Sequence, residues 1–583
     1  MPKITINGRN VEFQPGQTIL QAANAQQITI PQYCYHDGLS IAASCRICLV
    51  EIWAPNPKTG QLEPFMGGKL MPSCQQTASD GMVVYSDSPK AVANQKAVME
   101  YLLINHPLDC PVCDQSGECF LQDYSYEYGR GVSRFQEQKV KNPKKDVGPN
   151  VLLYSDRCIM CTRCVRFTRE VTGTSELTVT GRGNKEEIDV FPGIPLDNPL
   201  ASNVIDLCPV GALLDKDFLF AQRVWFLRET PGIDPLTASG DNITIHHNEG
   251  KVYRIKPRFN GAINKWWITD EVRYGWKFVH ADNRLRSPTR RQFGTVVECD
   301  YHLAYQEVLA AAKHATDEGK RLALLVSPML TCEEAWLLAK LALAIDPSAT
   351  LGVGPVPFHG EDKVYPPGAS ENDPKAFFVC SEKAPNARGV RRVLAAAAGG
   401  KAPLEFDAFV GALAGAGAVV LTGNYPSQWS TPGLIAALRG RFVAIIDTLS
   451  SDLTDAADVV IPGATFAEKA GTFENRSGVL QAFAQAIPVI ELAKAEGQIA
   501  LDLMSMLEGR PDRDENYRVI MVESTRGQVA AGAQTATPRA EAFDAGAVRA
   551  RMAVVSGLEM FASKVSLPSE AAAARTDMPI VSL

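Results

Sequence analysis

The sequence predicts a multidomain α/β protein, and two observations lead to that prediction. The chain has 583 residues, several times the length of an ordinary domain. Eleven of its 14 cysteines precede residue 209, whereas from about residue 300 short apolar runs alternate with segments rich in Ala and Leu. We therefore expect a thiol-rich first half and a second half built from a doubly wound sheet.

The composition argues against several classes of protein. The formal net charge is -7 and the Lys and Arg are dispersed, so electrostatics give no basis for binding nucleic acid. The sequence has no apolar run of about 18 residues and no N-terminal export signal. We expect a chain that is not exported and reaches a membrane only through partner subunits. In a reducing compartment, grouped thiols bind metal instead of forming disulfides.

Residues 1–80 are predicted to form a ferredoxin-like domain. An Asn-Gly pair joins two short strands within residues 3–13, and a helix follows from Thr18. Three thiols in one loop and a distant fourth are the arrangement of plant-type [2Fe–2S] sites, although the plant spacing is C-x4-C-x2-C. Small residues at 42–44 would let backbone N–H groups point at the sulfurs. Four unrelated buried cysteines are the less favoured alternative. The thiols are Cys34, Cys45, Cys48 and Cys74.

A second ligand set lies in residues 81–120, directly after a helix predicted from about Ala91 to Asn105. Its spacing is H-x3-C-x2-C-x5-C, which differs from the paired C-x2-C knuckles of zinc ribbons. The neighbouring thiol sets favour an iron–sulfur cluster here. Zinc, or a histidine that merely ends the helix, are the alternatives. The set consists of His106, Cys110, Cys113 and Cys119.

A third set lies in residues 121–220. Its C-x2-C-x2-C run places three thiolates around one corner, as a cubane needs, and a remote Cys-Pro supplies the fourth. Three arginines near these thiols either offset the negative charge of a cluster or are solvated helix residues, and the sequence does not decide between the two. The thiols are Cys158, Cys161, Cys164 and Cys208, and the arginines are Arg157, Arg163 and Arg166.

Residues 221–298 are predicted to form a small β-rich domain with a hairpin that turns at Asn248-Glu-Gly. No cysteine occurs between 208 and 299, so no cluster is expected in this segment. His246 and His247 point to opposite faces of the predicted strand and are expected at the surface rather than as ligands.

Residues 299–510 are predicted to form a parallel, doubly wound sheet. No glycine-rich nucleotide fingerprint follows any of its strands. Its cysteines, Cys299, Cys332 and Cys380, are scattered and are expected to be ordinary core residues. Residues 511–583 are rich in Ala, Gly, Thr and Pro and are expected to form an extended C-terminal tail over partner subunits. The predicted strands are 321–327, 376–379, 417–423, 442–447 and 457–462.

These motifs resemble those of the large iron–sulfur subunit of respiratory complex I, known as the G subunit in bacteria and as the 75-kDa subunit in mitochondria. The resemblance implies that the first set holds a [2Fe–2S] cluster and that the second and third sets each hold a [4Fe–4S] cluster. The stretches that carry it are Pro31-Gln-Tyr-Cys-Tyr-His, Cys45-Arg-Ile-Cys-Leu-Val-Glu-Ile, Asp109-Cys-Pro-Val-Cys-Asp-Gln-Ser-Gly-Glu-Cys, Arg157-Cys-Ile-Met-Cys-Thr-Arg-Cys, Thr180-Gly-Arg-Gly and Cys208-Pro-Val-Gly-Ala-Leu.

The second half is similar to molybdopterin oxidoreductases such as formate dehydrogenases. The similarity lies in the β-rich hairpin, in Asn283-Arg-Leu-Arg-Ser-Pro, in Ala457-Asp-Val-Val-Ile-Pro-Gly and in the stretch from Glu468. No cysteine is placed as a molybdenum ligand. A degenerate α/β domain without molybdenum cofactor is therefore expected.

The resemblance implies an electron relay without an active site of its own. Electrons would pass from a flavin- and NADH-binding subunit, through the three clusters and ferredoxin-like subunits, toward the quinone-facing subunits. The chain would lie peripherally on the cytoplasmic face of the bacterial inner membrane, held there by the complex. The alternatives are a subunit of a related soluble NAD-linked hydrogenase or formate dehydrogenase complex, and a self-contained enzyme, which would need further cysteines in the second half.

Overall fold

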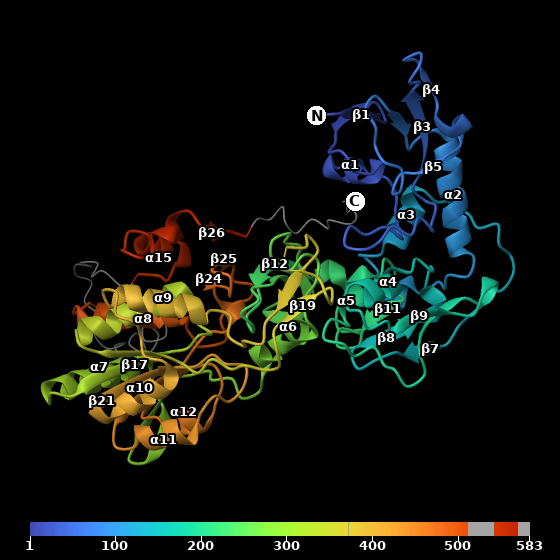
Figure 1. Ribbon diagram of the computed structural model, residues 1–583. Helices are drawn as coiled ribbons and strands as arrows, with labels where there is room; N and C mark the ends of the chain where they lie inside the picture. The colour runs from blue at the N-terminus through green and yellow to red at the C-terminus, as the bar shows by residue number, and fades with distance from the viewer. Residues whose placement is uncertain (371, 511–540, 569–583) are drawn as a thin grey trace, which may run out of the picture.

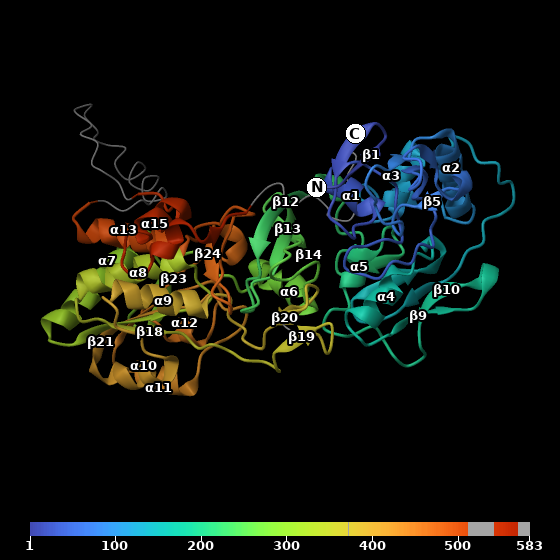
Figure 2. The ribbon, with the colours of Figure 1, turned by 45° about the horizontal axis from the view of Figure 1, so that its top comes forward.

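The computed structural model describes residues 1–370, 372–510 and 541–568. Figure 1 shows two lobes, one formed by the blue and teal N-terminal segments and one by the yellow to red C-terminal segments. The green β-rich strands lie between them in this view and in Figure 2. The predicted α/β multidomain class is confirmed. Within the described ranges, no helix is long and apolar enough to cross a membrane.

The chain opens with a mixed sheet whose first hairpin turns at Asn7-Gly8. Both residues adopt left-handed backbone conformations, with φ of 48° and 79°, as a two-residue hairpin turn requires. Thr18 then caps α1 (Ile19–Ala25), because its side chain accepts a hydrogen bond from the Gln21 N–H. The strands, in order across the sheet, are β2 (Arg9–Glu12), β1 (Lys3–Ile6), β6 (Val83–Tyr85), β3 (Leu49–Pro55) and β4 (Leu62–Pro64), and β5 (Met71–Pro72) also pairs with β3.

Short helices and small sheets follow and carry the second and third ligand sets. The helix predicted before His106 is α2 (Pro89–Leu103), which starts with Ser88 as its cap and a proline at its first position. The other elements are α3 (Phe120–Glu127), β7 (Lys144–Asp146), β8 (Val151–Tyr154), α4 (Arg163–Glu170), β9 (Leu177–Thr180), β10 (Glu187–Val190), α5 (Asn203–Leu207) and β11 (Leu213–Asp215). Two small antiparallel sheets result, β11-β8-β7 and β10-β9.

The β-rich segment is an antiparallel sheet of three strands, β12 (Arg228–Ile233), β13 (Asn242–Asn248) and β14 (Lys251–Pro257), followed by α6 (Asp270–Tyr274). The predicted turn is present, with Glu249 and Gly250 at φ of 47° and 77°. The predicted exposure of His246 and His247 is wrong, since they are only 4% and 8% exposed. Both are buried because β13 is the central strand of the sheet. The pairing of β13 with β14 also shifts register between His246 and His247.

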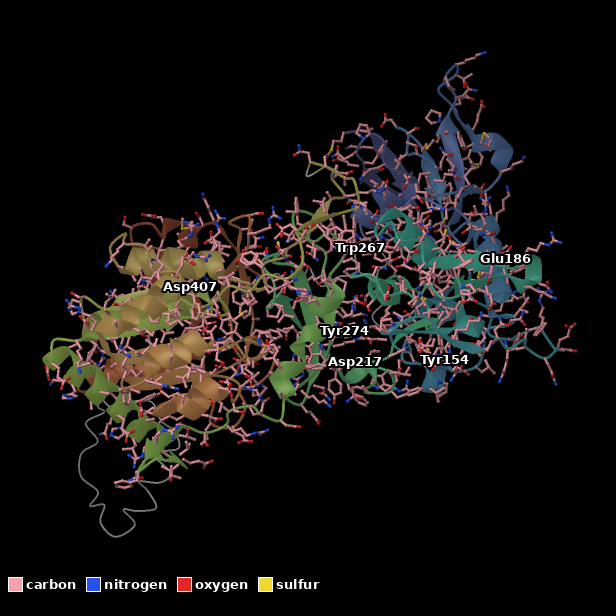
Figure 3. All side chains as sticks on the ribbon, turned by 60° about the horizontal axis from the view of Figure 1, so that its bottom comes forward. Tyr154, Glu186, Asp217, Trp267, Tyr274 and Asp407 are labelled. Atoms are coloured by element: carbon pink, nitrogen blue, oxygen red, sulfur yellow. The ribbon has the colours of Figure 1, made fainter. Side chains whose placement is uncertain are left out.

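Figure 3 labels residues at the border between this sheet and the N-terminal lobe. Trp267 stacks on the His36 ring at 5.4 Å and packs on Phe167 at 4.9 Å. The hydroxyl of Tyr274 lies 3.0 Å from that of Ser202. The β-rich segment therefore packs against the loop of the first thiol set and against the helices of the third.

The C-terminal lobe contains a sheet of seven strands. Strand residues alternate between two cores: Leu322, Leu324 and Val326 face one, and Ala323 and Leu325 face the other. Both faces are apolar, as a doubly wound sheet requires. Its strands, in order, are β16 (Thr295–Glu298), β15 (Thr289–Gln292), β23 (Val459–Pro462), β22 (Phe442–Asp447), β21 (Ala416–Thr422), β17 (Arg321–Val326) and β18 (Thr350–Val353).

Helices cover both faces, as Figure 1 shows with α8 and α9 on one side and α10 to α12 on the other. The first layer contains α7 (Tyr301–Asp317), α8 (Cys332–Ile345), α9 (Ala387–Ala397) and α13 (Glu496–Leu507). The second contains α10 (Phe406–Ala412), α11 (Pro432–Leu438) and α12 (Asp452–Ala456). Five neighbouring strands of this sheet are parallel, as predicted: β18, β17, β21, β22 and β23. The strands β15 and β16 add an antiparallel edge.

Two expectations for the second half need correction. The strand predicted at 376–379 exists as β20 (Phe377–Val379), but it pairs with β19 (Lys363–Tyr365) outside the large sheet. Residues 541–568 are not an extended tail: α15 (Ala545–Met552) and β26 (Val565–Ser566) follow, and β26 pairs with β25 (Leu480–Phe483), beside β24 (Gly471–Glu474). The buried side chains of Val548 and Met552 on α15 belong to the same core as Leu322, Leu324 and Val326. The low-complexity stretches around 528–538 and 570–575 fall outside the described residues.

Candidate metal centres

The first thiol set forms two pairs inside the N-terminal lobe. Cys34, Cys48 and Cys74 are at most 2% exposed, and Cys45 is partly buried. Cys34 is hydrogen-bonded to Cys45, and Sγ of Cys48 lies 3.5 Å from Sγ of Cys74. Two thiolates on one tetrahedral iron lie about 3.7 Å apart. Two pairs of thiols match two irons with two thiolates each, so these residues fit a [2Fe–2S] cluster.

The loop before Cys48 directs backbone N–H groups toward sulfur. Ala43 and Arg46 adopt left-handed φ values of 49° and 61°, although neither is glycine. The hydrogen bond from the Cys45 thiol is the main reason that the pKa of Cys34 is lowered; burial opposes it, and the backbone N–H groups of Cys45 and Ser44 add to the lowering. The small residues at 42–44 therefore allow the donor loop that their size predicted.

The second set lies between two helices, after the end of α2 and at the start of α3. Cys119 is the N-cap residue of α3, and the backbone N–H groups of Gln122 and Leu121 partly offset the burial that raises the pKa of its thiol. Cys113 and Cys119 are each 8% exposed, whereas Cys110 is exposed. Cys110 therefore faces the surface, and Cys113 and Cys119 face the interior.

His106 follows α2 in a mostly buried position that favours its neutral form. Burial lowers the pKa of the imidazole to about 4, and the nearby Arg157 adds to this effect. Burial raises the pKa of the Cys113 thiol, and the guanidinium of Arg157 partly offsets this rise. His106 and Cys113 therefore share one cationic neighbour. A neutral imidazole is the form that binds a metal.

The four thiols of the third set line one small cavity together with Ile159 and Pro209. Burial raises the pKa of each of these thiols. Backbone N–H groups of Val210, Ala212 and Leu213 point at Cys208 and act in the opposite direction. Four soft donors around one small apolar cavity fit a cubane. The members are Cys158, Cys161, Cys164 and Cys208.

The spacing of the side chains can be compared with two kinds of metal centre. In the described residues, no three His, Cys, Asp or Glu side chains converge as they would around one metal ion. Four ligands of one zinc ion all lie about 2.3 Å or less from the metal. In a cubane each ligand binds its own iron, so the ligands are spread farther apart.

The second and third sets touch at Gly211. A Cβ atom on Gly211 would lie only 2.3 Å from Sγ of Cys113, so no larger residue fits there without displacement. Arg157 lies at the same place, since it donates to the carbonyl of Gly211 and pairs with Asp109 at 2.7 Å. The Arg157 guanidinium also lies 4.0 Å from the ring centre of Tyr154, which Figure 3 labels.

All three arginines near the third set are buried, which excludes their interpretation as solvated residues. Arg157, Arg163 and Arg166 are 3%, 0% and 4% exposed. Arg163 donates to the carbonyls of Tyr35 and Leu207. Arg166 donates to the carbonyls of Cys34, Ser40 and Cys161. These side chains therefore tie the loop of the first set to the helix of the third.

A carboxylate that the motifs did not single out holds the second set from outside. Glu118 accepts two hydrogen bonds of 2.9 Å from Arg254 on β14, and Lys256 lies 3.1 Å away. Arg223 donates to the carbonyls of Pro111 and Cys113. No local pattern in the sequence indicates that Arg223, Arg254 and Lys256 contact this loop, because they are more than 100 positions away from it.

The cysteines of the second half lie apart from one another. Cys332 and Cys380 are 0% and 2% exposed, and Cys299 is partly buried. The thiol of Cys332 lies 3.5 Å from the amide oxygen of Asn386. These contacts are those of ordinary core residues, as expected.

Family models match five stretches of the chain. The first half matches a 2Fe-2S iron-sulfur cluster binding domain over 2–89, the NADH-ubiquinone oxidoreductase-G iron-sulfur binding region over 95–134 and the NADH-quinone oxidoreductase subunit 3 ferredoxin-like domain over 148–214. The NDSU1/NuoG-like 4Fe-4S domain matches 227–277, a stretch without cysteine in this sequence. The molybdopterin oxidoreductase model matches 419–505. The chain therefore carries domains of both cluster types.

Curated relatives agree with these matches. The G subunit of the NADH-quinone oxidoreductase of Rickettsia prowazekii is 37% identical over 341 residues, 58% of this chain and 48% of the relative. The mitochondrial NADH-ubiquinone oxidoreductase 78 kDa subunit of Neurospora crassa is 38% identical over 343 residues, 58% of this chain and 44% of the relative. A crystal structure of an NAD+-reducing [NiFe]-hydrogenase has 30% identity, a TM-score of 0.33, and coverage of 38% of this chain and 91% of that one.

The chain spans about half the length of the curated relatives it matches. All twelve predicted ligands lie within the three stretches that the family models for the cluster regions match. The resemblance inferred from the motifs is thus confirmed: over its aligned part the chain is similar to the G subunits of NADH-quinone oxidoreductases.

Proposed function

We propose that the chain is the electron-relay subunit of an NADH-quinone oxidoreductase. It takes electrons from a flavin- and NADH-binding subunit and passes them, through ferredoxin-like subunits, toward the quinone-facing ones. The observation that carries the proposal is the packing of three soft ligand sets in one lobe, joined by buried arginines. Bound clusters supply one-electron chemistry, while the protein fixes their positions and potentials.

The proposal assigns one [2Fe–2S] and two [4Fe–4S] clusters. The paired thiols of the first set would hold the two-iron cluster. The cavity of the third set and the loop of the second would hold the cubanes. The proposed ligands are Cys34, Cys45, Cys48 and Cys74; then His106, Cys110, Cys113 and Cys119; then Cys158, Cys161, Cys164 and Cys208.

The residues of the C-terminal lobe support a structural role. In the parts of the lobe that the structure describes, its cysteines stand apart, and its buried cations pair with carboxylates of the same lobe. We therefore propose that this domain carries no molybdenum cofactor and no independent active site. The chain would reach the cytoplasmic face of the inner membrane peripherally, through its partners.

The test is the metal content of the anaerobically reconstituted full-length protein. We expect about ten irons per chain and electron paramagnetic resonance signals of one two-iron and two four-iron clusters. A protein that takes up zinc in place of iron under these conditions would contradict the assignment. NADH, formate and hydrogen should each fail to reduce a dye with the isolated chain.

The partners can be identified by affinity purification from the native host. Recovery with flavin- and quinone-reactive subunits supports the proposal. Recovery with a nickel-containing hydrogenase or a molybdenum-dependent formate dehydrogenase would instead assign the chain to a soluble NAD-linked complex.

A further inference from the structure

One nitrogen atom of Arg166 contacts ligand residues of two different centres. Nη2 donates to the carbonyl oxygen of Cys34 in the first set and, at 3.3 Å, to the carbonyl oxygen of Cys161 in the third. Cys34 precedes Arg166 by 132 residues, so this contact exists only in the folded chain. A single guanidinium therefore forms a hydrogen-bonded bridge between the two ligand loops.

The rest of the side chain fixes this bridge in place. Nη1 of Arg166 donates to the carbonyl of Ser40, whose own N–H donates to Glu170 at 2.8 Å. Ser40 lies on the segment of the first set that joins Cys34 to Cys45. Arg166 and Glu170 lie one turn apart on α4 (Arg163–Glu170), so the helix holds this segment through two charged side chains. With 4% of its surface exposed, Arg166 has little freedom to move.

A buried cation in this position acts on both clusters in the same direction. Reducing either cluster adds one negative charge close to the guanidinium. Burial keeps the interaction from being screened by water and salt. Hydrogen bonding to the backbone of a ligand residue also holds the local dipoles in one orientation. The reduced state of each cluster is stabilised, and both reduction potentials rise.

We propose that Arg166 is a positioning residue that couples the first and third centres, holding their ligand loops together and raising the reduction potentials of both clusters. The proposal rests on the proposed function, since it presupposes the clusters. It goes further by giving one side chain an effect on two centres at once.

The test compares three variants of the full-length, reconstituted protein. Arg166→Gln removes the charge, Arg166→Lys keeps the charge but loses the fork that reaches both carbonyls, and Arg169→Gln is the matched control. Arg169 lies on the same helix, has a side chain that is 62% exposed and pairs with Glu170 at 3.1 Å. Iron content is measured first. Redox titration followed by electron paramagnetic resonance then gives the potential of each cluster.

We expect both potentials to shift to more negative values in Arg166→Gln, to shift by less in Arg166→Lys and to stay unchanged in Arg169→Gln. If Arg166→Gln loses a cluster, the shift in the reduction potentials of Arg166→Lys becomes the deciding measurement. Wild-type potentials for either cluster in the deciding variant, with its iron complete, overturn the proposal. Wild-type protein without iron–sulfur signals refutes the proposed function itself, which is a different result.

Discussion

The two lobes place their buried cations differently. In the C-terminal lobe they face carboxylates: Lys469 lies 3.0 Å from Glu334 and 2.7 Å from Glu496, and Arg284 lies 2.8 Å from Glu468. In the N-terminal lobe, Arg166 donates to the backbone carbonyls of Cys34 and Cys161, and Arg157 donates to the carbonyl of Gly211 besides pairing with Asp109. The C-terminal lobe balances these charges with carboxylates, whereas the N-terminal lobe also places cations beside thiol residues, which would become anionic on binding metal.

The largest expected effect comes from removing one cysteine in each lobe. Cys164→Ala takes a thiol from the cavity of the third set, so we expect a loss of about four irons per chain. Cys332→Ala removes a core thiol that is 0% exposed and should leave the iron content unchanged, at a cost of about 1 kcal/mol of stability. Iron analysis and thermal unfolding measure the two outcomes. Loss of iron in Cys332→Ala would contradict the assignment of all iron ligands to the N-terminal lobe.

The next test removes a buried cation of the C-terminal lobe. Lys469→Met leaves Glu334 and Glu496 buried without their cation, so we expect about 3–5 kcal/mol of destabilisation. The control is Lys320→Met, whose side chain is 55% exposed beside Glu318 and should change stability by less than about 1 kcal/mol. Denaturant unfolding gives the difference. Equal effects of the two substitutions would mean that the buried network contributes no more than a surface pair.

Overpacking at a glycine sharpens the comparison further. In Gly211→Ala the new Cβ would lie 2.3 Å from Sγ of Cys113, so the four-iron signal of the second set should weaken or disappear. In Gly352→Ala the Cβ would lie 2.4 Å from the ring of Phe409, and we expect about 1–3 kcal/mol of destabilisation with full iron. Electron paramagnetic resonance and thermal unfolding distinguish the two. An unchanged four-iron signal of the second set in Gly211→Ala would show that the loop around Cys113 can shift to accommodate the new methyl group.

The smallest effect is a pH dependence of the metal-free protein. Burial lowers the folded pKa of His106 to about 4, below its ordinary value of 6.5. Above pH 6.5 the imidazole is neutral in both the folded and the unfolded protein. As the pH falls from 6.5 to about 4, the unfolded protein binds a proton at His106 that the folded protein does not. The free energy of unfolding therefore decreases, with a slope that corresponds to at most one proton. His106→Phe should remove this slope. A slope that is identical in the variant would assign it to other groups.

Local features were predictable, and distant contacts were not. The turn at Asn7-Gly8, the cap at Thr18 and the ligand spacings depend on neighbouring residues, so the sequence predicts them. The contacts of Arg166 and Glu118 join residues 132 and 136 positions apart, and no local pattern encodes such a pair. The strand β20 has the same apolar character as a central strand, so its place outside the large sheet could not be inferred.

The ion pairs of Glu118 have a consequence for the order in which the protein matures. During translation Glu118 leaves the ribosome 136 residues before Arg254 and 138 before Lys256, the residues that hold it. The distant hydrogen bonds that hold the loop of the first set come from Arg163 and Arg166, which leave the ribosome before β14. The first centre can therefore be secured earlier than the second. The second is secured only after β14 has been synthesised and has folded back onto it.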